Sequence, residues 1–119
     1  MCLTKGYIYL RENELYDMHN VYKIGETTNI LEKDVYYSKY EITKGLFKTI
    51  YEIDITKLNI TKNLLEYEFL KHCTKHNSEK FYNKQIINMI EQVLIKYNIQ
   101  YKKLNKVDID RLMEIKSKL

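Results

Sequence analysis

The chain has 119 residues, of which 45% are hydrophobic and 30% charged, with a formal net charge of +4. This length supports one core, the apolar content excludes a disordered tail, and no apolar run reaches the roughly 20 residues that span a bilayer. Cys2 and Cys73 are too few for a disulfide framework, and the N-terminus lacks the apolar stretch of a signal peptide. We therefore exclude membrane, secreted-scaffold and fibrous classes and expect an intracellular, cytoplasmic protein.

Hydrophobic periodicity predicts alternating strands and helices with no linker or repeat between them. A polar stretch, 12–20, separates the first two strands and is expected to be a loop. Thr27-Thr28-Asn29 supplies N-cap chemistry for the first helix. In chain order, we expect strands at 6–10 and 21–24, a helix over 29–40, a strand over 46–55, a helix over 59–76, a short extended piece at 81–82, and helices over 83–97 and 108–119. The fold class is α/β (α+β): a small, three-stranded, mostly antiparallel sheet with flanking helices.

Short motifs follow one another in a characteristic order. Gly6-Tyr7-Ile8-Tyr9-Leu10 comes first, then Tyr22-Lys23-Ile24-Gly25, then a capped helix, a glutamate-bearing helix and finally Glu79-Lys80-Phe81-Tyr82-Asn83. This order resembles the GIY-YIG nucleases. It is most similar to their phage and large-virus branch, where the second motif commonly reads Lys-Ile-Gly. The resemblance implies a GIY-YIG-like domain over residues 1–100, with 101–119 as a helical extension of the same domain and, for a viral or phage chain, a location in the host cell.

The resemblance also implies a metal-dependent DNA endonuclease that hydrolyses phosphodiester bonds. Tyr9 matches the tyrosine that activates or orients water, and Lys23 takes the place of the second motif's tyrosine, where it would contact a phosphate. Glu68, followed by His72 at the family's spacing, is the expected ligand of Mg²⁺ or Mn²⁺, with Glu66 as the other candidate. Asn83 would orient substrate or water. We expect Tyr9, Lys23, Glu68 and Asn83 to converge on one cleft.

Each of these residues also has a purely structural interpretation, which the sequence leaves open. Tyr9 would then be a core tyrosine, Lys23 a lysine on an exposed strand and Glu68 a solvated helix residue. Asn83 would be the N-cap of the helix that follows it.

One departure from the family pattern concerns the first helix, where the family carries an arginine that offsets charge on the scissile phosphate. This chain has no arginine between Arg11 and Arg111. Lys33 lies in the matching stretch and is the expected substitute, but it lacks the planar fork of a guanidinium. Losing one preorganised donor costs roughly 2.7–4 kcal/mol of transition-state stabilisation. Two interpretations follow: a slowed endonuclease, or a catalytically inactive module that binds nucleic acid, a protein partner or a second copy of the chain.

A second feature is the cluster Tyr36-Tyr37-Ser38-Lys39-Tyr40, in which three tyrosines are interspersed with a serine and a lysine. Proteins that bind single-stranded nucleic acid use such residues to stack bases. Packing of the helix against the core is the alternative interpretation.

Overall fold

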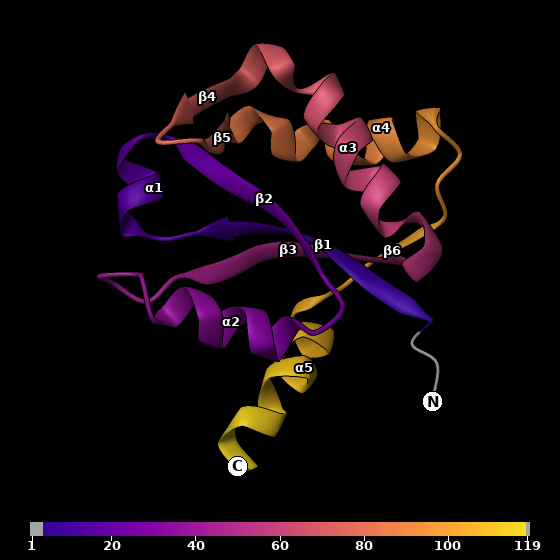
Figure 1. The fold of residues 1–119 in the computed structure, drawn as a ribbon. Helices are drawn as coiled ribbons and strands as arrows, with labels where there is room; N and C mark the ends of the chain where they lie inside the picture. The colour runs from indigo at the N-terminus through magenta and orange to yellow at the C-terminus, as the bar shows by residue number, and fades with distance from the viewer. Residues whose placement is uncertain (1–3, 119) are drawn as a thin grey trace.

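An antiparallel sheet forms the middle layer of the protein, and the computed structural model describes residues 4–118 (Figure 1). Over these residues the sheet has six strands in the order β4-β5-β2-β1-β3-β6. The strands are β1 (Lys5–Glu12), β2 (Val21–Thr27), β3 (Leu46–Asp54), β4 (Cys73–His76), β5 (Glu79–Asn83) and β6 (Tyr101–Lys103). The α-helices are α1 (Glu14–Met18), α2 (Ile30–Ser38), α3 (Leu58–Glu68), α4 (Ile90–Lys96) and α5 (Lys106–Lys118), and short 3₁₀ turns are η1 (Ile55–Lys57), η2 (Leu70–His72) and η3 (Lys84–Asn88).

The three central strands are those that the sequence predicts. β1 lies between β2 and β3, and Tyr9 stands opposite Gly25 on one side and Ile50 on the other. Helices α3 and α4 cover one face of this sheet, and α2 and α5 cover the other (Figure 1). Because successive side chains alternate between faces, Ile8 packs into the core under α3 and α4, whereas Tyr9 packs into the second core under α2.

The expected class, a mixed fold with an antiparallel sheet, is confirmed, but the three-stranded sheet is wrong. β5 contains the expected extended piece at 81–82, but it pairs with the unexpected strand β4 in a hairpin. The turn residues, Asn77 and Ser78, have φ of 50° and 69°, as tight hairpin turns require. This hairpin joins β2 at Val21 and Tyr22. β6 pairs with β3 and forms the other edge of the sheet. It has only three residues, too few for the alternating hydrophobic pattern of a strand to be visible in the sequence.

Three expected segments, one loop and two helices, have a different secondary structure. The predicted loop 12–20 contains α1, capped by Asn13, whose side-chain oxygen accepts a hydrogen bond from the Tyr16 amide at 2.9 Å. The predicted helix 59–76 ends at Glu68, and its last part forms η2 and β4. The predicted helix 83–97 is divided into η3 and α4. By contrast, Asn29 caps α2 as expected, accepting from the Glu32 amide at 3.0 Å.

The C-terminal segment is built into the same body as the rest of the chain. Instead of being wholly helical, 101–119 begins with β6 in the sheet, and α5 then packs Ile109, Leu112 and Met113 against the Tyr9 core. Cys73 packs against the other core, and Cys2 lies outside the described residues. Among residues 4–118, no helix is both long enough and apolar enough to span a bilayer.

Candidate functional site

Two adjoining hollows lie beside β2, and both are lined by Lys23 and Glu79. We call the first the polar cleft; its volume is about 280 Å³. It is lined by Lys23, Ile24, Lys62, Glu66, Ser78, Glu79, Lys80 and Tyr82. It forms because β2 pairs with β5 only at Val21 and Tyr22, so side chains rather than backbone bridge the strands beyond that point.

Ion pairs hold the polar cleft together. The Lys23 ammonium donates to Glu79 at 2.7 Å, and the Lys80 ammonium donates to Glu66 at 2.8 Å. Burial disfavours the charged form of Lys23, but the hydrogen bond to Glu79 and the favourable electrostatic interactions with Glu79 and nearby tyrosines together outweigh this effect and raise the Lys23 pKa. Burial, helped by the nearby Glu66 carboxylate, raises the pKa of Tyr82 on the cleft wall. The polar cleft therefore holds two lysine–glutamate ion pairs side by side, Lys23–Glu79 and Lys80–Glu66.

We call the second hollow the aromatic groove; its volume is about 720 Å³. It runs between α1, the C-terminal end of α2 and the β4–β5 hairpin. Its lining is mainly aromatic and apolar: Asn13, Glu14, Leu15, Tyr16, Met18, Lys23, Tyr36, Tyr37, Tyr40, Glu41, Ile42, Thr43, His76, Glu79 and Phe81. Leu15, Met18, Tyr36, Tyr40 and Ile42 are all at least half exposed there.

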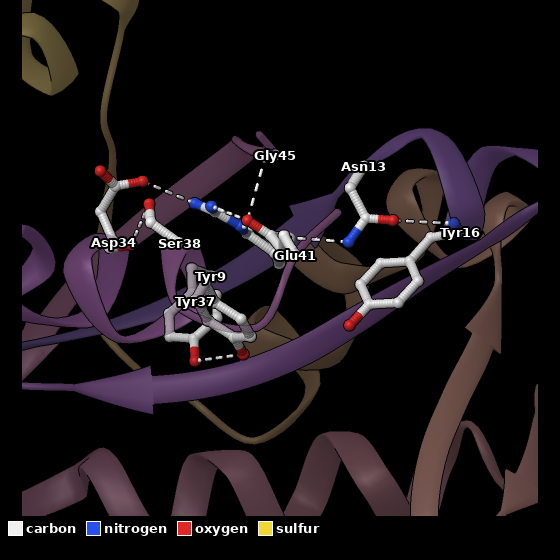
Figure 2. Close-up of polar contacts among 9 residues, drawn as sticks. Tyr9, Asn13, Tyr16, Asp34, Tyr37, Ser38, Glu41 and Gly45 are labelled. Carbon is white, nitrogen blue, oxygen red and sulfur yellow. Dashed lines mark hydrogen bonds and ion pairs between the residues drawn. The ribbon is translucent and has the colours of Figure 1, made fainter. Parts of the chain in front are cut away.

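Tyr9 lies beneath this groove and does not open into it. Its side chain is 1% exposed, and its hydroxyl lies 2.8 Å from that of Tyr37, which lines the groove (Figure 2). Burial raises the pKa of Tyr9 far above its usual range, and burial also raises that of Tyr37. A Cβ at Gly25 would collide with the Tyr9 ring. Gly25 is therefore required by the space that Tyr9 occupies rather than by a turn.

A buried arginine braces the wall of the groove. Arg11 is 0% exposed and donates to Asp34 at 3.0 Å and to Glu41 at 2.6 and 3.1 Å. Glu41 in turn accepts from Asn13 at 2.9 Å, which connects α1 to the segment after α2 (Figure 2). Although burial opposes ionisation, the hydrogen bonds from Arg11 lower the Glu41 pKa. Because its guanidinium is enclosed, Arg11 cannot contact a bound substrate.

Glu68 lies away from both hollows. It is the last residue of α3, and one carboxylate oxygen accepts from the Lys96 ammonium at 2.8 Å and from the Tyr97 hydroxyl at 2.5 Å. These hydrogen bonds lower its pKa. The helical Glu68–His72 spacing is wrong, because His72 belongs to η2. Tyr9 and Glu68 lie on opposite faces of the sheet, so the expected convergence on one cleft is not met.

The remaining predicted residues have separate positions. Asn83 ends β5, and its side-chain oxygen accepts from the Gln85 amide at 3.0 Å, so it caps η3. The Lys33 ammonium lies 4.9 Å from the centre of the Tyr36 ring, beside the aromatic groove. Of the five predicted residues, only Lys23 lines a hollow; Lys33 is near one.

Sequence reasoning gave no role to Glu79 and preferred Glu68 to Glu66, yet Glu66 and Glu79 share the polar cleft with Lys23. A signal for Glu79 was present, because it opens the Glu-x-Phe-Tyr element. Because α3 ends at Glu68, Glu68 and His72 are not one helical turn apart on the same helix, and the spacing gives no reason to prefer Glu68.

Three carboxylates are the candidates for holding a metal ion. Glu68, Glu66 and Glu79 each form an ion pair with a lysine ammonium, so this pairing does not distinguish them. Glu66 and Glu79 differ from Glu68 in lining the polar cleft, and Mg²⁺ is commonly held by one or two carboxylates plus water. Within the described part of the chain, no group of three or more His, Cys, Asp or Glu side chains is placed to hold a metal.

The fold and the two hollows define a small α/β sandwich with a charged cleft at the junction of β2 and β5. No protein-family model matches the sequence, and no solved structure matches it. The chain is similar to part of the phenylalanine–tRNA ligase beta subunit of Mycoplasma capricolum, with 31% identity over 106 residues. The match covers 84% of this chain and 13% of that subunit, so the likeness concerns one segment of a much longer protein.

Proposed function

We propose that the chain is a GIY-YIG-like phosphodiester hydrolase acting on DNA, with its active site in the polar cleft. The observation that carries this proposal is a meeting of three segments distant in the sequence. Lys23 comes from the Lys-Ile-Gly motif, Glu66 from the glutamate-bearing helix and Glu79 from the Glu-x-Phe-Tyr element, and all three line the same cleft. The fold brings the three elements together, because β5 pairs with β2 and α3 packs against β2; what supports the proposal is that their meeting point is lined by lysines and carboxylates.

The side chains of the cleft suit a phosphodiester. Lys23, Lys62 and Lys80 place ammonium groups around it and would bind the phosphate as point charges. Glu66 and Glu79 would hold Mg²⁺ or Mn²⁺. Such a cation, when bound, would offset the negative charge that develops on the phosphate. A phosphate that pairs with Lys23 and Lys80 would also release Glu79 and Glu66 from their present ion pairs.

A second candidate function is a catalytically inactive module that binds nucleic acid through the same surface. Two observations favour it. Tyr9 is enclosed and its pKa is raised, so its hydroxyl is a poor base at neutral pH. In addition, α2 offers Lys33 where the family uses an arginine, and Lys33 lies against the Tyr36 ring.

Cleavage assays separate these candidates. The native chain is incubated with supercoiled plasmid, single-stranded DNA and tRNA, with Mg²⁺ or Mn²⁺ or with EDTA; tRNA is included because the similar subunit is named as a tRNA ligase. We expect metal-dependent DNA cleavage that Lys23→Ala reduces at least about tenfold, whereas Lys48→Ala, on an exposed position of β3, leaves it unchanged. Salt-sensitive binding without cleavage would instead identify the inactive module.

A further inference from the structure

The aromatic groove adjoins the polar cleft but has a different chemical character. Lys23 and Glu79 form the shared boundary of the two hollows. A ligand whose phosphate lies at Lys23 therefore has its next chemical group at the mouth of the groove. The groove volume of about 720 Å³ falls within the roughly 300–1,000 Å³ of small-molecule sites.

Aromatic side chains stand on both walls of this groove. On the α2 side, Tyr36 and Tyr40 are 50% and 72% exposed, and their ring centres lie 5.2 Å apart. On the opposite side, the Tyr16 and Phe81 rings are 5.3 Å apart. Exposed tyrosines of this kind give flat faces on which a nucleobase can stack.

The charges divide between the hollows as a nucleotide's do. In the groove, Glu41 is neutralised by Arg11 and Glu79 by Lys23, so most of its acidic lining is paired. In the cleft, three lysines face two carboxylates. An aromatic base suits the first environment and an anionic phosphate the second. A nucleotide joins an aromatic base and an anionic phosphate in one unit, whereas a protein segment would need an acidic side chain placed beside an aromatic one.

We propose that the aromatic groove holds an unpaired base of a nucleic-acid strand whose phosphate lies in the polar cleft. This inference rests on the proposed function and specifies its substrate class: single-stranded nucleic acid, or a duplex with unpaired nucleotides. A base in a continuous duplex is stacked between its neighbours and reaches such a pocket only if it is flipped out, which costs a few kcal/mol.

Equilibrium binding in EDTA tests this inference without cleavage. Fluorescence anisotropy is measured with a labelled single-stranded oligonucleotide and with its blunt duplex. Tyr36→Ala and Tyr40→Ala are compared with Tyr67→Ala, because Tyr67 lies on α3, is 67% exposed and does not line the groove. We expect tighter binding to the single strand, and a loss of about 5-fold or more for each groove variant, since stacking contributes about 1–3 kcal/mol per base. Tyr67→Ala and the phenylalanine variants of Tyr36 and Tyr40 should bind like the native chain.

Several results would overturn the inference. Equal affinity for duplex and single strand would do so, as would equal losses from the groove variants and Tyr67→Ala. Sedimentation showing a dimer that Met18→Lys dissociates would mean that a second copy covers the groove. The binding measurement is independent of catalysis. If the native chain cleaves nothing but prefers the single strand as expected, only the hydrolase proposal fails. If it cleaves DNA without that preference, only the groove assignment is contradicted.

Discussion

Replacing Arg11 with methionine should destabilise the protein more than any exposed substitution. The Arg11 side chain is 0% exposed, and its guanidinium forms hydrogen bonds to Asp34 and Glu41 and lies 4.7 Å from the centre of the Phe47 ring. Methionine replaces the aliphatic part of the arginine side chain but removes the guanidinium cation from two buried carboxylates. Breaking a buried ion pair in this way costs about 3–5 kcal/mol. Because small domains have about 5–15 kcal/mol of stability, the variant should still fold.

Urea unfolding followed by far-UV circular dichroism measures this loss by linear extrapolation. The matched control is Arg111→Met, because Arg111 is the other arginine of the chain and is exposed on α5; we expect a change within about 0.5 kcal/mol. Adding Glu41→Gln to Arg11→Met should recover part of the loss, because one carboxylate then no longer needs a cation. A loss below about 1 kcal/mol in Arg11→Met would refute the reasoning, because it would mean that the buried charges are solvated or compensated elsewhere.

Three further predictions concern the same side of the sheet. Gly25→Ala should lower the free energy of unfolding by about 1–3 kcal/mol, because the new Cβ displaces the Tyr9 ring; wild-type stability would show that the ring moves freely. Tyr9→Phe should lower it by about 0.5–1.5 kcal/mol through loss of the 2.8 Å hydroxyl contact. Under the proposed function, the same variant should leave the rate of metal-dependent DNA cleavage unchanged, and complete loss of cleavage in a folded variant would show that Tyr9 takes part in the reaction. The Glu41 pKa is lowered from 4.5, so the contribution of Glu41 to stability is present above pH 4.5 and is lost as pH falls below it. Glu41→Gln should therefore weaken the dependence of the free energy of unfolding on pH in this acid range. An unchanged dependence would rule out Glu41 as its source.

The central hairpin and the helix cap were predictable because their signals are local. β-branched and aromatic residues define β1 and β2, and Asn29 caps α2 as its position in the sequence suggests. The edges of the sheet were not predictable in the same way. β4 follows a helix without a break, and Cys73 continues the apolar spacing of that helix although it begins a strand. Pairing with β5 overrides this local pattern.

The site was predictable in its motifs but not in its geometry. The sequence identifies the segments around Lys23 and Glu79, but which glutamate of α3 faces them depends on where the helix lies over the sheet. Glu66 and Glu68 are two positions apart, so they point in different directions around the helix axis. The burial of Tyr9 depends on Tyr37, 28 residues away, and no local pattern reports that contact.

A direct comparison of Glu66→Gln with Glu68→Gln tests the central claim, that the polar cleft rather than the end of α3 carries the chemistry. Both changes remove one charge from the same helix and keep the side-chain size, so each serves as the control for the other. In metal-dependent cleavage of DNA, we predict that Glu66→Gln loses activity at least about tenfold and that Glu68→Gln cuts like the native chain. Activity lost in Glu68→Gln and retained in Glu66→Gln would contradict the account.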